Sequence, residues 1–139
     1  MRIIFPYTKR IDEVIEALPP NTNEFFMNDS HSYPDLLQAM WDIGESFVIV
    51  EHDVVAPDLS EIMECPEDWC AYGYKDDAES FLGCVKISKK IIETIPHVWR
   101  LMPNRVWNLC DVHFKDVATK AGFTVHQHYP SLKHIKAAI

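Results

Sequence analysis

Residues 47–53 of the chain read Phe-Val-Ile-Val-Glu-His-Asp. A continuous apolar run such as the first four of these residues is typical of a β-strand that is buried on both faces. In open α/β sheets, ligands bind beyond the carboxyl ends of the strands. We therefore predict a buried strand at Phe47–Val50, with a ligand site at the polar residues that directly follow it.

Glu51 and Asp53 are the two acids of this polar segment. They are two residues apart, so an extended backbone would direct both carboxylates to the same side. Two carboxylates can hold a hard divalent cation, which in turn can hold phosphates. Acid-x-acid triplets are common by chance, and a polar loop after a strand would read the same way. The rest of the chain has to decide between these interpretations.

Three histidines, His126, His128 and His134, lie near the end of the chain. We predict a strand at residues 123–128 and a turn at residues 129–130. His126 and His128 would then face one side of the strand, and imidazole is a common ligand of transition metals. Taken alone, the pair also fits an edge strand with two solvated histidines. Together with the acid triplet, it favours a metal site built from two distant segments.

Strand and helix signals alternate along the whole chain, which predicts the α/β class. We expect a single domain over residues 1–139, a three-layer α/β/α sandwich around a mostly parallel mixed sheet. The predicted strands are residues 2–6, 24–27, 47–50, 69–74, 81–87 and 123–128. Predicted helices cover residues 11–18, 57–63 and 105–120, and two further helices begin at Pro34 and Lys89. We expect Ser88 and Asn104 to cap the last two helices.

Charge is distributed unevenly in this acidic chain of 139 residues, whose formal net charge is −8. Residues 1–83 carry 18 acidic and 4 basic side chains, whereas residues 84–139 carry 3 acidic and 9 basic ones. This division would suit a cation near the acids and an anionic ligand near the basic part, although a solvated acidic surface would also explain it. The acidic total argues against indiscriminate binding of duplex nucleic acid.

The composition also limits the location of the protein. No apolar run approaches the length of a membrane span, and the first residues become polar too soon for a signal peptide. None of the cysteines forms a C-x-x-C pair, and Cys84 and Cys110 lie in apolar surroundings that are typical of buried free thiols. We therefore expect a cytoplasmic protein.

Taken together, these segments resemble a small glycosyltransferase of the type A (GT-A) fold. Five segments carry the resemblance: the first strand and its exit with Pro6, Tyr7 and Thr8; residues 47–53; residues 82–84; residues 107–111; and the three C-terminal histidines. Glu51 stands where the family usually has an aspartate, and the chain is shorter than most members. No second acid lies next to Asp111.

The resemblance implies transfer of a sugar from a nucleoside-diphosphate sugar to an acceptor. It implies that Asp53 and Glu51 bind Mn²⁺ or Mg²⁺, with His126, His128 or His134 as further metal ligands or phosphate partners. Since the side chain of Glu51 is one methylene longer, it would alternatively bind ribose or a metal-bound water. A nitrogen ligand would favour Mn²⁺.

Other positions gain roles from the same resemblance. Tyr7 and Thr8, next to Pro6, would contact the nucleotide base, and His52 belongs to the acid triplet of the donor site. Arg10 and Lys86 would lie near the diphosphate. Asp111 would be the general base if the reaction inverts the anomeric centre.

The sequence leaves the acceptor open: it would be a nucleic acid, a protein or a small molecule. The short chain suggests that a second copy in a homo-oligomer completes the acceptor site. Two other functions remain compatible with the same residues. One is a metal-dependent hydrolase of nucleotide sugars, and the other is a nucleotide-binding or interaction protein that kept the fold and lost catalysis.

Overall fold

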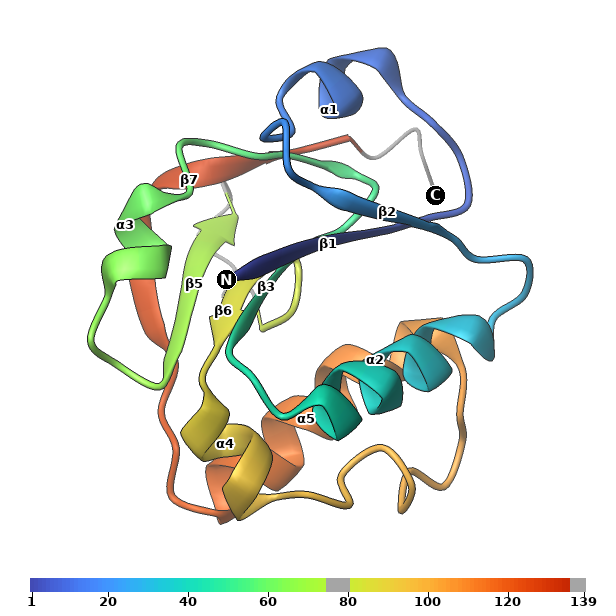
Figure 1. Ribbon diagram of the computed structural model, residues 1–139, viewed down its shortest axis with the longest axis vertical. Helices are drawn as coiled ribbons and strands as arrows, with labels where there is room; N and C mark the ends of the chain where they lie inside the picture. Colours follow the sequence, from blue (N-terminus) through green and yellow to red (C-terminus); the bar gives the residue numbers. More distant parts are fainter. Residues whose placement is uncertain (75–80, 136–139) are drawn as a thin grey trace.

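The predicted strand at Phe47–Val50 is β3, a fully buried strand in the interior of the sheet. The computed structural model describes residues 1–74 and 81–135. Its seven strands form one curled sheet in the order β2-β1-β3-β6-β5-β7-β4 (Figure 1). The other strands are β1 (Arg2–Tyr7), β2 (Asn23–Phe26), β4 (Val54–Val55), β5 (Trp69–Tyr74), β6 (Cys84–Ile87) and β7 (His126–His134). The helices are α1 (Asp12–Glu16), α2 (Ser32–Ile43), α3 (Ser60–Glu64), α4 (Lys89–Thr94) and α5 (Trp107–Lys120).

The structure confirms the α/β class and the mixed sheet, but the expectation of mostly parallel pairing is wrong. β1–β2, β1–β3 and β5–β7 are parallel. β3–β6, β5–β6 and β4–β7 are antiparallel. β5 and β6 are separated only by residues 75–83, which is too short for the crossover that parallel neighbours need. A regular three-layer sandwich remains a prediction.

The two faces of β3 contribute to two separate apolar cores because side chains alternate along a strand. Phe47 and Ile49 belong to a core that includes buried residues of α2, α4 and α5. Val48 and Val50 belong to a second core, shared with residues of α1 and α3. Figure 1 shows α2, α4 and α5 grouped on one side of the sheet, with α1 and α3 elsewhere.

An aromatic cluster fixes α2 and α5 against the sheet. Trp41 of α2 meets Trp99 edge-on at 5.5 Å between ring centroids, and Phe114 of α5 stacks on Trp99 at 6.0 Å. Trp69 of β5 meets Phe114 edge-on at 5.1 Å. This packing sets the positions of α2 and α5, both of which contribute side chains to the site described below.

Two predicted helix ends have different outcomes. Ser88 caps α4 as expected, since its hydroxyl accepts a hydrogen bond from the backbone N–H of Ile91 at 3.4 Å. Asn104 does not cap α5: that helix begins at Trp107, and its N-cap residue, Val106, makes no side-chain cap.

Cys84 and Cys110 are buried free thiols, as predicted. The predicted strand at residues 81–87 is confirmed from Cys84 onward.

The last strand is longer than predicted. β7 extends to His134, and no turn interrupts it at residues 129–130. Its pairing with β5 shifts register, because His128 pairs with Tyr72 while Leu132 pairs with Tyr74. The far end of β7 pairs with β4, where His134 lies opposite Val54. In the part of the chain that the structure describes, no helix combines the length and apolarity that a membrane crossing requires.

Candidate functional site

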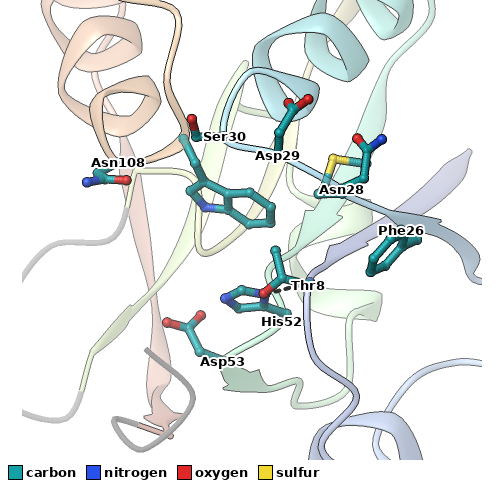
Figure 2. Close-up of a pocket in the computed structure, with 10 residues that line it drawn as sticks. Thr8, Phe26, Asn28, Asp29, Ser30, His52, Asp53 and Asn108 are labelled. Atoms are coloured by element: carbon teal, nitrogen blue, oxygen red, sulfur yellow. Dashed lines mark hydrogen bonds between the residues drawn. The ribbon is translucent and has the colours of Figure 1, made fainter.

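A cavity of about 640 Å³ opens where three parallel strands end (Figure 2). Thr8 follows β1, Phe26 ends β2, and His52 and Asp53 follow β3. Trp107, at the start of α5, completes the wall. This is the edge of the sheet at which the sequence predicted a ligand site. The cavity is mixed in character, since it combines aromatic faces with a carboxylate and an imidazole.

His52 joins three parts of this wall. Its Nδ1 accepts a hydrogen bond from the backbone N–H of Thr8 at 3.1 Å (Figure 2). Its ring stacks on Trp107 at 4.9 Å between centroids, with 22° between the ring planes. Burial lowers the pKa of His52, against a smaller opposing effect of Asp53. Because Nδ1 acts as an acceptor, the ring is neutral and carries its proton on Nε2.

Glu51, directly before His52 in the chain, lies among other acidic groups. Burial raises its pKa from 4.5 to about 8, and the charges of Asp53 and Asp111 contribute in the same direction. The hydroxyl of the fully buried Tyr33 interacts with the Glu51 carboxyl and partly opposes the shift. That contact does not reach the geometry of a full hydrogen bond. Glu51 therefore carries a proton near neutral pH unless a cation offsets the neighbouring charges.

Asp111 of α5 lies close enough to Glu51 for the two charges to interact. Burial raises its pKa to about 6, although a hydrogen bond from the backbone N–H of Leu82 and the charge of Lys115 lower it. Its Oδ1 atom is buried and has no hydrogen-bond partner. A carboxyl group with a pKa near 6 can accept a proton at neutral pH, as a general base must.

Asp53 is oriented by the end of β7. His134 contacts it through Nε2, which lies 2.7 Å from Oδ2 of Asp53. The backbone carbonyl of Asp53 accepts a hydrogen bond from the N–H of Ile135 at 2.6 Å. Two of the predicted residues from distant segments, Asp53 and His134, are thus brought together. A fixed carboxylate at a cavity wall is suited to hold a cation or a polar ligand group.

The structure places His126 and His128 elsewhere. They pair with Cys70 and Tyr72 of β5, which both belong to the apolar core on the α3 side of the sheet. His128 contacts Oε1 of Glu61 in α3 at 3.0 Å. Glu51 continues the alternation of Phe47 and Ile49, and it interacts with Tyr33 of α2 on the opposite face. The three predicted histidines are therefore divided between two places.

The four remaining predicted donor-site residues do not line the cavity. Lys86 is buried below α3, where its Nζ donates to the backbone carbonyls of Cys65 and Glu67. Pro6 is buried within β1. Tyr7 lies between Phe5 and Phe26, at 5.6 and 5.7 Å between ring centroids. Arg10 covers the Tyr7 ring and pairs with Glu24.

The site also contains residues that the sequence did not single out. Tyr33 was missed because an aromatic residue at the start of an amphipathic helix is normally part of the core. Phe26 was assigned only to a strand, yet it is 61% exposed at the cavity. An exposed phenylalanine within a predicted strand cannot be recognised as such until the pairing of β1 and β2 is known.

The buried Glu51 carboxyl gives a testable pH dependence of stability. Its folded-state pKa, about 8, lies above its ordinary value of 4.5, so the folded protein binds the extra proton between these limits. Stability should therefore fall as pH rises across this window, by at most about 1.4 kcal/mol per pH unit from this group. Urea unfolding of the native protein and Glu51→Gln, between about pH 5 and pH 8, measures the difference. An unchanged difference across the window would show that Glu51 is not held protonated.

Similarity of the chain to known proteins is limited to the fold. No known family model and no curated protein sequence matches the chain. The structure is similar to that of A197 from STIV, with a TM-score of 0.58 and 18% identity, over 96% of this chain and 84% of the other. It is also similar to a glycosyltransferase involved in the glycosylation of the major capsid of PBCV-1, with a TM-score of 0.55 and 14% identity, over 93% and 81%. At these identities the likeness concerns the fold, which this chain shares with a glycosyltransferase.

Proposed function

We propose that the chain is a metal-dependent glycosyltransferase of the GT-A type, which moves a sugar from a nucleoside-diphosphate sugar to an acceptor. One observation carries the proposal: the cavity at the ends of β1, β2 and β3 has Asp53 in its wall, and two further carboxyls, Glu51 and Asp111, lie close enough to interact electrostatically. The fold similarity to a glycosyltransferase supports the same assignment.

The carboxyl groups of Asp53 and Glu51 are chemically suited to bind a divalent cation. The charge of Asp53 raises the pKa of Glu51, and a cation bound between them would relieve this repulsion. Mg²⁺ and Mn²⁺ are commonly bound by one or two carboxylates together with phosphate oxygens of the substrate. Asp53 would hold the ion with Glu51, and the ion would stabilise the charge that develops on the leaving diphosphate. His134 keeps the Asp53 carboxylate in position.

The aromatic part of the cavity is suited to a nucleotide base. Phe26 and Trp107 contribute aromatic rings to its wall, and Thr8 provides a hydroxyl group. Stacking on such rings accommodates any base, whereas hydrogen bonds select among bases. In this arrangement Tyr7 supports Phe26 from behind rather than meeting the base itself. The donor would thus lie with its base at Phe26 and its diphosphate toward Asp53.

Asp111 is the residue we assign to proton transfer. Its pKa of about 6 and its unpartnered, buried Oδ1 suit a group that removes a proton from an acceptor hydroxyl. This role applies to an inverting reaction. The acceptor would be a nucleic acid, a protein or a small molecule, and the cytoplasm would be the site of action. A second copy of the chain would complete the acceptor side.

Calorimetric titration tests the donor site. UDP, GDP, dTDP and ADP are each added to the protein with Mn²⁺, and again with a chelator. We expect one nucleotide to bind, and its binding to be lost with the chelator. Absence of binding by every nucleotide in the presence of Mn²⁺ would contradict the proposal. Glu45→Gln, an exposed acid remote from this cavity, is the control that should bind as the native protein does.

A hydrolase is the second function that a specific observation favours. An Asp111 carboxyl with a pKa near 6 could activate water as readily as an acceptor hydroxyl. The two functions differ in their need for an acceptor. Steady loss of nucleotide sugar without any acceptor, at the rate seen with one, would favour hydrolysis over transfer.

A further inference from the structure

A second group of potential metal ligands lies on the α3 side of the sheet. It consists of Cys65, His126 and His128, whose ligand atoms all lie within 4.8 Å of one another. Among residues 1–74 and 81–135, no other set of three cysteine, histidine or acidic side chains meets this distance. The group lies on the opposite face from Glu51, so the donor site proposed above does not use it.

The fold explains why these three side chains meet. His126 and His128 are two apart on β7 and pair in parallel register with Cys70 and Tyr72, so both face the side that α3 covers. Cys65 follows α3 directly and is buried. Lys86 holds the segment after α3 in place, because its Nζ donates to the backbone carbonyl of Cys65. The thiol and the two imidazoles are thus positioned by the segment after α3, by Lys86 of β6 and by β7.

His128 is oriented as a metal ligand usually is. Its Nδ1 lies 3.0 Å from Oε1 of Glu61, and its side chain is only 9% exposed. Its Nε2 is buried and has no hydrogen-bond partner. A carboxylate on one ring nitrogen fixes the tautomer and leaves the other nitrogen free to coordinate, which is the common arrangement around zinc. Without a ligand, the buried Nε2 atom is energetically unfavourable.

We propose that Cys65, His126 and His128 bind Zn²⁺ as three protein ligands of a tetrahedral site. Bonds of about 2.0–2.3 Å to nitrogen and sulfur place neighbouring ligand atoms of such a site about 3.3–3.8 Å apart. The observed 4.8 Å limit requires only small movements of side chains to reach this geometry. His126 is exposed, so the fourth position would be open to solvent.

The ligand set distinguishes this site from the acid site. A thiolate with two imidazoles selects zinc-like ions, whereas carboxylates and phosphates suit Mg²⁺ and Mn²⁺. The zinc ion would join the segment after α3 to β7. The far end of the same strand carries His134 to Asp53. Zinc would therefore hold the segment after α3 against the strand that supports the acid site. Its open fourth position differs from the four protein ligands of a closed structural site.

Cobalt spectroscopy tests the proposal on the whole chain. After removal of metal with a chelator, Co²⁺ is added in steps and the visible and near-ultraviolet spectra are recorded. We expect one equivalent to give the strong visible bands of tetrahedral Co²⁺ and a thiolate-to-cobalt charge-transfer band, both removed by added Zn²⁺. Absence of the charge-transfer band at one equivalent would overturn the proposal.

Variants identify the ligands. His126→Gln changes an exposed side chain and should fold normally while losing the tetrahedral spectrum. Cys65→Ser should lose the charge-transfer band, and Glu61→Gln should weaken zinc affinity about 10–100-fold. His97→Gln, another exposed histidine, is the matched control and should keep the full spectrum. A spectrum that survives both His126→Gln and Cys65→Ser would overturn the assignment.

The two metal sites can be tested separately. Asp53→Asn alters the acid site and should leave the cobalt spectrum unchanged, because Asp53 contacts His134 and neither His126 nor His128. Loss of the cobalt spectrum in Asp53→Asn would overturn the proposal of a separate zinc site. Failure of nucleotide binding with a normal cobalt spectrum would instead count only against the donor site.

Discussion

Asp53→Asn is expected to abolish metal-dependent nucleotide binding while the protein remains folded. The substitution keeps the size of the side chain but removes the charge that would hold the cation. Loss of a metal ligand should weaken metal binding by more than the roughly 10–100-fold that follows loss of a ligand's hydrogen-bond partner. His134 can still donate to the amide oxygen at this position, so the end of β7 should stay in place. The measurement is calorimetric titration with the nucleotide that the native protein binds, with Mn²⁺ present.

The control for this variant is Asp116→Asn, an exposed acid of α5 that pairs with Lys120. It removes the same charge from the chain without touching the cavity. Equal nucleotide affinities of native protein and Asp53→Asn would place the donor site elsewhere. Equal losses in both variants would indicate a general effect of net charge instead of a ligand role.

Asp111→Asn is expected to lower the transfer rate about 10²–10⁴-fold, the usual contribution of a general base. Donor affinity should change little, because Asp111 is not among the residues that line the donor cavity and Asp53 remains. The native rate should rise with pH through about 6, as Asp111 loses its proton, and this rise should be absent from the variant. The measurement is kcat/KM against pH with a working acceptor.

A loss of donor affinity with an unchanged pH profile would assign Asp111 a structural role instead. Asp116→Asn, on the exposed side of the same helix, should retain both the rate and the pH profile. A retaining reaction would also leave the rate of Asp111→Asn close to that of the native protein. The stereochemistry of the product, read by nuclear magnetic resonance, separates that case from a wrong site assignment.

The sequence predicts the interior strands well and their directions poorly. Phe47–Val50 and Trp69–Tyr74 begin and end as predicted, because apolar runs that are buried on both faces leave a strong local signal. The antiparallel direction of β6 depends on which strands become its neighbours, and local sequence patterns do not encode the choice of neighbours. Alternation of strands and helices suggested parallel pairing, but the short connection before β6 prevented it.

The site shows the same limit. The Glu51–Asp53 segment was found because it follows a recognisable strand. The separation of His134 from His126 and His128 was missed because the predicted turn at residues 129–130 is absent and β7 continues to His134. Lys86 resembled a phosphate partner in the sequence, yet it satisfies carbonyl groups in the interior. The outcomes for His134 and Lys86 depend on where a strand ends and which face it buries, and a single sequence determines both only weakly.

The reversed direction of β6 has a consequence for how the site could change. β6 runs antiparallel to its neighbours β3 and β5, so it begins at the edge of the sheet where they end. The residues that enter β6 therefore border the acids. Gly83 accepts a hydrogen bond from the backbone N–H of Glu51 at 2.8 Å, and the N–H of Leu82 reaches Asp111. Under the proposed transfer reaction, substitutions in this entry segment would therefore reshape acceptor selectivity. Substitutions after Ile87, at the opposite edge of the sheet, would leave it untouched, so a library aimed at new acceptors belongs at the beginning of β6.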